Sequence, residues 1–339
     1  MKAKLTTLCL FSLLLISCND EPQIGYVARQ EVILSEISDQ AKAYLDEILD
    51  IMEHNSINKY KINWIDFRKE VFNAVPTAQT IDHTYPGIYI ALKLLGDNHS
   101  MYITPNNVAI GYSSLTFQIE NIETPVIPDD IGYVKVASYT GTADDASAIA
   151  FTNQIQNQIK QQDHSDLKGW IVDLRNNTGG NMWPMLAGIG PILGEGVAGY
   201  FIYPYPDNKP AVSWNFQDGE GAFAQSNNDR SVRTPLNNSY NLLVPKPKVA
   251  VLLNSAVASS GEVIAISFIG RENTKSFGSA TIGLSTCNSS FQLSDNATLI
   301  LTTAYLADRN KKIYGVPINP DQISSSRTII NDAITWIRE

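Results

Sequence analysis

The chain has 339 residues, of which 44% are apolar, so wholesale disorder is excluded. Its 34 acidic and 25 basic side chains give a net charge of −9, which argues against a nucleic-acid partner because such a partner needs a basic face. Four scattered histidines and three cysteines, without HxxxH or CxxC spacing, argue against a metal site. We therefore expect neither a metal nor another cofactor.

The first residues have the pattern of an export signal. Two lysines precede an apolar stretch over residues 5–16, which is too short to span about 30 Å of hydrocarbon. The letters LISC at residues 15–18 resemble the lipobox of bacterial lipoproteins, which implies cleavage before Cys18 and its diacylation. We expect a signal peptide over 1–17, an acidic tether over 18–27 and a lipid-anchored protein of the bacterial cell envelope, on the periplasmic or surface-exposed side of the outer membrane. The alternative is an ordinary signal peptide that is cut elsewhere.

The next part of the chain has helical spacing of apolar residues. This spacing predicts a helix over residues 31–54. A second helix is predicted from the N-cap Asn63 to Pro76, and a third ends at Gly96. Residues 28–104 are therefore expected to form a small N-terminal helical subdomain.

From about residue 109, short apolar runs alternate with helical patterns. Strand–helix alternation predicts an α/β core over residues 105–339. Strands are predicted at 131–136, 170–174, 249–253 and 299–304, and helices from 144, over 182–193, over 259–270 and at 330–337. The polar stretch 206–240, rich in Asn, Asp, Gly and Ser, predicts a long loop or excursion.

A histidine and a glycine pair follow two of these elements. His99 lies in the loop GDNHS after the third helix, where it either reaches a cleft or stays a surface side chain. Gly179 and Gly180 end the run DLRNNTGG, and adjacent glycines permit positive φ and can turn backbone amides into an oxyanion hole. The alternative is an ordinary turn in which Asp173 and Arg175 are paired.

Two serines lie between a predicted buried strand and a predicted buried helix. Ser259 or Ser260 at a helix N-terminus is near free amides and the positive end of the dipole, which stabilise a developing anion. Ser259 and Glu262 also match the Ser-x-x-Glu capping box, which needs no catalysis. On these residues alone, a nucleophile and a helix cap are both open.

The motifs occur in an informative order. The series LLGDNHS, GYVKVASY, GWIVDLRNNTGGN, VAVLLNSAVASSGE and SFGSATIG resembles the tail-specific, or C-terminal-processing, serine peptidases and the catalytic core of tricorn protease. The resemblance implies a crotonase-like ββα-spiral core and acyl transfer from a peptide or unfolded-protein substrate to Ser259, with Ser260 as rival nucleophile. It also implies an oxyanion hole formed by the Ser260 amide and that of Gly179 or Gly180.

The catalytic base departs from the tail-specific pattern. Those peptidases carry a lysine in a late F-G-K-G motif, and Ser279 stands at that place here. Tricorn-type members use a histidine from the preceding helical region, so the resemblance implies His99, whose ordinary pKa near 6.5 suits a base at neutral pH. The acid that orients it is not assigned, because Asp97 is too near in sequence and Asp321 is only a guess.

Substrate recognition also departs from the family. Only about 30 residues separate Tyr102 from Ile131, and a PDZ domain needs ~80–100. Peptides would then be recognised by the cleft itself, with Trp183 and Tyr112 as candidate lining residues that are more often core. Two other functions stay open: a catalytically inactive crotonase-fold lipoprotein that binds a ligand or peptide, and a surface lipoprotein that presents a flat face over the Gly179 turn.

Overall fold

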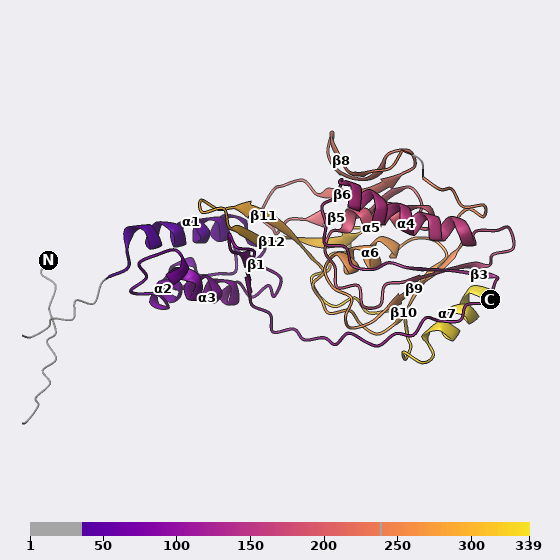
Figure 1. Ribbon diagram of the computed structural model, residues 1–339, viewed down its shortest axis with the longest axis horizontal. Helices are drawn as coiled ribbons and strands as arrows, with labels where there is room; N and C mark the ends of the chain where they lie inside the picture. Colours follow the sequence, from indigo (N-terminus) through magenta and orange to yellow (C-terminus); the bar gives the residue numbers. More distant parts are fainter. Residues whose placement is uncertain (1–35, 238) are drawn as a thin grey trace, which may run out of the picture. The chain divides into compact units, whose positions relative to one another are not determined.

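The structure is a computed structural model that describes residues 36–237 and 239–339 (Figure 1). The described residues belong to one compact unit, Glu36–Glu339. The predicted signal peptide, Cys18, the tether and the start of the first predicted helix lie outside the described residues. Within the described ranges, no helix is long and apolar enough to cross a membrane.

The helical region follows from local capping signals. It consists of α1 (Asp39–Asn55), α2 (Trp64–Asn73), the 3-10 helix η1 (Asp82–Thr84) and α3 (Tyr85–Leu95). Ser38 caps α1 by accepting the Ala41 amide, and Asn63 caps α2 by accepting two amides. Gly96 ends α3 with a φ of +67°. The prediction of a small helical region before an α/β core is confirmed.

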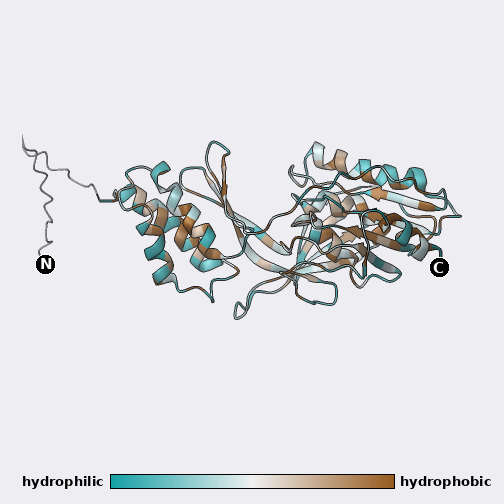
Figure 2. Ribbon diagram, turned by 90° about the horizontal axis from the view of Figure 1, so that it is seen from below, coloured by the Kyte–Doolittle hydropathy of each residue, from teal (hydrophilic) through white to brown (hydrophobic). Residues whose placement is uncertain are grey.

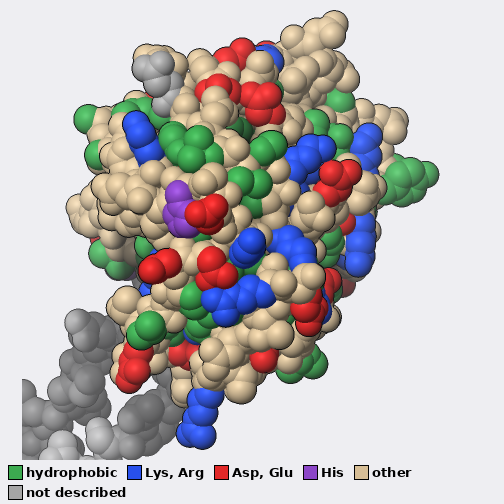
Figure 3. All heavy atoms as spheres, turned by 90° about the vertical axis from the view of Figure 1, so that its right-hand side faces the viewer, with side chains coloured by type: hydrophobic (Ala, Val, Ile, Leu, Met, Phe, Trp, Pro, Cys, Tyr) green, Lys and Arg blue, Asp and Glu red, His purple; other side chains and the backbone are tan. Residues whose placement is uncertain are grey.

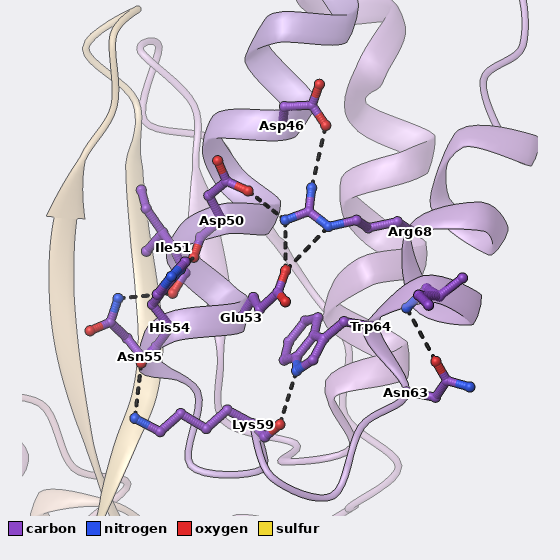
Figure 4. Close-up of polar contacts among 11 residues, drawn as sticks. Asp46, Asp50, Ile51, Glu53, His54, Asn55, Lys59, Asn63, Trp64 and Arg68 are labelled. Carbon is purple, nitrogen blue, oxygen red and sulfur yellow. Dashed lines mark hydrogen bonds and ion pairs between the residues drawn. The ribbon is translucent and has the colours of Figure 1, made fainter. Parts of the chain in front are cut away.

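A charge cluster joins the first two helices (Figure 4). The Arg68 guanidinium of α2 reaches three carboxylates of α1, at 3.3 Å from Asp46, 2.5 Å from Asp50 and 2.8 Å from Glu53. Burial disfavours the charged form of Arg68, but the hydrogen bonds to Glu53 and Asp50 outweigh it and raise its pKa. Because these groups are partly exposed, the cluster contributes modestly to stability and chiefly fixes the two helices to each other.

A five-stranded parallel sheet forms the centre of the α/β core. Its strand order is β13-β10-β9-β4-β3. The strands are β3 (Ile131–Lys135), β4 (Gly169–Asp173), β9 (Lys248–Leu253), β10 (Thr274–Gly278) and β13 (Gln322–Ile323), and the helices are α4 (Ala146–Gln162), α5 (Met182–Leu193), α6 (Ser260–Phe268) and α7 (Ile329–Arg338). Side chains of α4, α5 and α6 pack on one face of the sheet, and those of α7 pack on the other. The central strands β4 and β9 are accordingly mostly apolar, with the charged residues Asp173 and Lys248 at their ends (Figure 2).

A second, antiparallel sheet connects the core to the helical region. Its order is β2-β1-β12-β5-β6-β7-β8, with β11 also paired to β12. The strands are β1 (Met101–Ile103), β2 (Ala109–Gly111), β5 (Gly196–Ile202), β6 (Val212–Gln217), β7 (Gly221–Ser226), β8 (Asp229–Pro235), β11 (Thr286–Gln292) and β12 (Thr298–Asp308). One end of β12 pairs with β1 and the other with β5, and the β11–β12 hairpin adds Leu293, Leu299 and Leu301 to the helical core (Figure 1). This hairpin connects the helical region to the α/β core.

Of the two alternatives predicted for residues 206–240, a long loop or an excursion, the long loop is wrong. The stretch contains β6, β7 and β8, and the buried rings of Trp214 and Phe216 face the interior. Gly219 and Asn227 have positive φ and form the tight turns between these strands. The polar residues that predicted one long loop are therefore the turns and the solvent face of a sheet.

One long connection has no regular structure. Residues 112–127, which we call the strap, form neither helix nor strand and run extended from β2 toward β3 (Figure 1). Outside the strap, residues 104–130 contain β2 and two short turns, at 105–107 and 129–130. The end face in Figure 3 shows acidic and basic side chains interspersed, so this face presents no continuous basic stripe.

Candidate active site

Ser259 occupies a strained turn between β9 and α6. Its φ of +52° and ψ of −119° are unusual for a residue with a side chain and cost on the order of 1–3 kcal/mol. The buried Glu262 carboxylate accepts the Ser259 amide at 3.0 Å, and the Ala258 amide donates to the Asn177 carbonyl at 3.0 Å. The surrounding contacts therefore hold the Ser259 hydroxyl at the C-terminal edge of the parallel sheet.

This strain has a measurable consequence. We expect Ser259→Gly to be about 1 kcal/mol more stable than Ser259→Ala, because only glycine adopts positive φ without a Cβ penalty. Both substitutions remove the hydroxyl, so the difference in the free energy of unfolding reports the backbone alone. Denaturant unfolding of the two variants measures it, and equal stabilities would show that the turn relaxes when the hydroxyl is lost.

His99 meets Ser259 from the helical region. The Asp97 carboxylate accepts the amides of His99 at 2.9 Å and Ser100 at 2.8 Å, which shapes the loop after α3. The His99 ring is thereby placed with Nε2 3.0 Å from the Ser259 Oγ. The fold thus brings together two side chains that are 160 positions apart in the sequence.

The other ring nitrogen contacts a hydroxyl group. His99 Nδ1 lies 2.8 Å from Thr286 Oγ1, at the first residue of β11. An imidazole that accepts the Ser259 proton at Nε2 carries its own proton at Nδ1, so Nδ1 donates to the Thr286 oxygen. Burial lowers the pKa of His99 to about 4, although the nearby Asp97 charge raises it. The ring is therefore neutral, and able to accept a proton, throughout the physiological pH range.

Neither aspartate considered from the sequence orients this ring. The Asp97 carboxylate is engaged by the two loop amides and the Ser100 hydroxyl, and the Asp321 carboxylate accepts the Ser276 amide and hydroxyl. Within the described ranges, no carboxylate contacts the imidazole of His99. Thr286 was missed because threonine has no local signal for this position, and only the pairing of β11 with β12 brings it to the site.

The glycine pair lies against the serine. A Cβ on Gly179 would be 2.8 Å from the Ser259 Cβ, so only glycine fits beside the serine. The Gly179 amide donates to the Asn177 side chain at 3.0 Å, so it is already engaged. Among the described residues, the amides of Gly180 and Ser260 donate to no protein acceptor. These two amides are therefore the better candidates for an oxyanion hole.

The second serine is differently placed. The Ser260 side chain is buried, and its hydroxyl donates to the Gly180 carbonyl at 2.6 Å. A hydroxyl engaged in this way is not free to attack a substrate. Of the two adjacent serines, only Ser259 contacts the imidazole.

The Asp173–Arg175 ion pair exists alongside the glycine turn. Arg175 Nη2 lies 2.6 Å from Asp173 Oδ2, both side chains are buried, and the Tyr133 hydroxyl donates to the same carboxylate oxygen at 2.8 Å. A turn stabilised by the Asp173–Arg175 pair and a turn that supplies an oxyanion-hole amide are therefore compatible. The ion pair anchors the same turn that carries the glycines.

The candidate cleft aromatics pack on the protein itself. Trp183 contacts Phe201 edge-on with ring centroids 6.5 Å apart, and Tyr112 contacts Tyr89 edge-on at 6.1 Å. The described ranges hold no group of three or more metal-ligating side chains.

Comparison with known proteins identifies the family. The model of peptidase family S41 matches residues 130–324, which is more than half of the chain. The chain therefore belongs to peptidase family S41, whose members are serine proteases. The expected relation to the C-terminal-processing peptidases is confirmed.

Two relatives illustrate the range of this similarity. The nisin-resistance protein of Lactococcus lactis is 28% identical over 277 residues, covering 81% of this chain and 80% of that protein. The carboxyl-terminal-processing protease of Synechocystis is 24% identical, covering 57% of this chain and 38% of that protein.

Two solved structures share the fold. A lipoprotein from Streptococcus agalactiae has a TM-score of 0.68 at 24% identity, covering 89% of this chain and 97% of that chain. The photosystem II D1 C-terminal processing protease has a TM-score of 0.51 at 14% identity, covering 85% and 94%.

Proposed function

We propose that this chain is an active serine peptidase in which Ser259 is the nucleophile and His99 is the general base. The observation that carries the proposal is the 3.0 Å distance between His99 Nε2 and Ser259 Oγ, within a chain of family S41. That distance lies in the range from which a base removes the proton of a nucleophile.

The reaction follows from these contacts. His99 Nε2 takes the hydroxyl proton as Ser259 Oγ bonds to the peptide carbonyl carbon, and the amides of Ser260 and Gly180 stabilise the oxyanion. The imidazolium gives this proton to the leaving amine as the C–N bond breaks, which leaves an acyl-enzyme. A water then loses a proton to His99, attacks the ester carbonyl and releases the acid, and the proton returns to Ser259. In the tautomer whose Nε2 is free to accept a proton, the Thr286 hydroxyl accepts the Nδ1 proton of the ring.

Location and substrate belong to the same proposal. Diacylation of Cys18 would hold the peptidase at the cell envelope, and the segment over residues 1–18 together with the lipoprotein among the structural relatives supports this. Nisin is a suitable peptide to test, because a relative covering most of this chain is named for resistance to it.

A fluorophosphonate probe tests the nucleophile. We expect the wild type and Ser260→Ala to be labelled, and Ser259→Ala not to be labelled, because only Ser259 contacts the base. Gel fluorescence after reaction at neutral pH measures the labelling. Labelling that survives in Ser259→Ala but is lost in Ser260→Ala would move the nucleophile by one residue.

A catalytically inactive, ligand-binding lipoprotein is the second candidate. One observation favours it: the ring of His99 faces a threonine hydroxyl rather than a carboxylate, so an imidazolium gains little stabilisation. Absence of labelling in all three proteins would support this function and contradict the peptidase.

A further inference from the structure

The strap backbone is largely unpaired. Among the described residues, no backbone group between 112 and 127 bonds to another backbone group. Within residues 115–119, the Leu115 amide donates to the Ser113 hydroxyl at 3.2 Å, and the other backbone groups have no partner in the described part of the chain. An extended chain whose N–H and C=O groups are unpaired is a template for a further strand. The strap is therefore a potential pairing edge that the fold itself does not use.

Two asparagines hold the strap beside the candidate active site. The Asn98 side chain, next to His99, accepts the Ser114 amide at 2.7 Å and the Ser114 hydroxyl at 3.0 Å. The Asn176 side chain accepts the Glu120 amide at 3.2 Å and donates to the Glu120 carbonyl at 2.8 Å. Asn98 belongs to the loop that carries His99, and Asn176 belongs to the turn that carries Gly179 and Gly180.

The second anchor is also connected to the nucleophile turn. The Asn254 side chain, which follows β9, donates to the Asn176 side chain at 2.9 Å and accepts the Asn176 amide at 3.0 Å. Five residues lie between the two strap anchors, Ser114 and Glu120, a span of at most about 20 Å. The free part of the strap therefore runs between the two loops that meet at Ser259.

The side chains of this free part alternate. Leu115, Phe117 and Ile119 share one face because successive side chains of an extended chain point to opposite sides. Phe117 is 41% exposed and Ile119 is 60% exposed, although both are large and apolar. This stretch therefore combines a largely unpaired backbone with an apolar face.

We propose that residues 115–119 of the strap are the docking edge for an extended segment of the substrate polypeptide. The segment pairs its backbone with the strap, sets apolar side chains against Phe117 and Ile119, and directs a peptide bond to Ser259. The inference rests on the proposed peptidase function. The occupant is a segment of unfolded polypeptide, because such a segment can extend along the strap with its own backbone groups unpaired, and because the strap is held by both loops of the site.

Protection of the serine tests the docking edge. The labelling rate of Ser259 by a fluorophosphonate is measured with increasing β-casein, an unfolded protein, and compared with the same variant without casein. We expect casein to protect the wild type, and Phe117→Ser and Ile119→Ser to need about tenfold more casein, as loss of one apolar contact implies. Val126→Ser is the matched control, since Val126 is 93% exposed and lies beyond the second anchor.

The outcomes separate the two proposals. No labelling of the wild type overturns the peptidase function. Normal labelling that casein does not slow, or that casein slows equally in the wild type and both strap variants, overturns the docking edge alone. Light scattering tests the other occupant, a second copy of this chain: a dimer that Phe117→Ser and Ile119→Ser dissociate would also overturn it.

Discussion

Replacing His99 with glutamine lowers kcat/KM for a peptide substrate by about 10²–10⁴-fold, the usual contribution of a positioned base. Glutamine keeps a polar group beside Ser259 but cannot accept its proton. The control is His164→Gln, which removes an exposed histidine that contacts the Asp129 carbonyl and should leave kcat/KM unchanged. Steady-state kinetics on a fluorogenic peptide measure both variants. An activity within threefold of the wild type would show that His99 is not the base.

The pH profile of the wild type identifies the same group. Because burial lowers the pKa of His99 to about 4, kcat/KM falls as the pH drops through about 4 and stays level from about pH 5 to 8. The sequence alone predicts that kcat/KM falls near pH 6.5, because that is the ordinary pKa of histidine. A fall in kcat/KM near pH 6.5 would mean that the Asp97 charge raises the pKa of His99 as much as burial lowers it.

The order of the sequence motifs was sufficient to predict that Ser259 and His99 lie in one site. Their roles as nucleophile and base remain predictions. It could not identify Thr286, because the pairing of β11 with β12 is a long-range property that no local pattern encodes. For the same reason, strands β6, β7 and β8 were predicted as a loop: their turn residues were visible, but their sheet partners were not. Local signals such as helix caps, helix ends and buried strands were predicted well because each depends on neighbours in the chain.

Glu262 illustrates how a local interpretation was correct but incomplete. The sequence predicts a helix cap, and the carboxylate does accept the Ser259 amide. Its other oxygen accepts the Thr281 hydroxyl at 2.6 Å and the Gly283 amide at 3.1 Å. This one buried side chain therefore connects the nucleophile turn to the loop after β10. A sequence pattern could show only the first of these contacts.

Replacing Glu262 with alanine lowers the free energy of unfolding by about 2–4 kcal/mol, since three buried donors lose their acceptor, an effect partly offset by relief of the buried charge. Glu262→Gln should lose less, because its amide oxygen can still accept the Thr281 hydroxyl and the Gly283 amide. Denaturant unfolding at pH 7 measures both variants. A loss below 0.5 kcal/mol for alanine would show that the two loops do not depend on this carboxylate.

The pH dependence of stability gives the sharper result. Burial raises the pKa of Glu262 to about 7, so between about pH 4.5 and 7 the folded state holds a proton that the unfolded state has released, and stability falls as pH rises. His99 acts oppositely: between about pH 4 and 6.5 the unfolded state holds the extra proton, and stability rises with pH. The two slopes, each at most about 1.4 kcal/mol per pH unit, oppose each other in the wild type. Glu262→Gln removes the falling slope and leaves that of His99. The free energy of unfolding of this variant should therefore rise between pH 4.5 and 6.5 more steeply than that of the wild type. Parallel curves would contradict the shifted pKa of Glu262 or of His99.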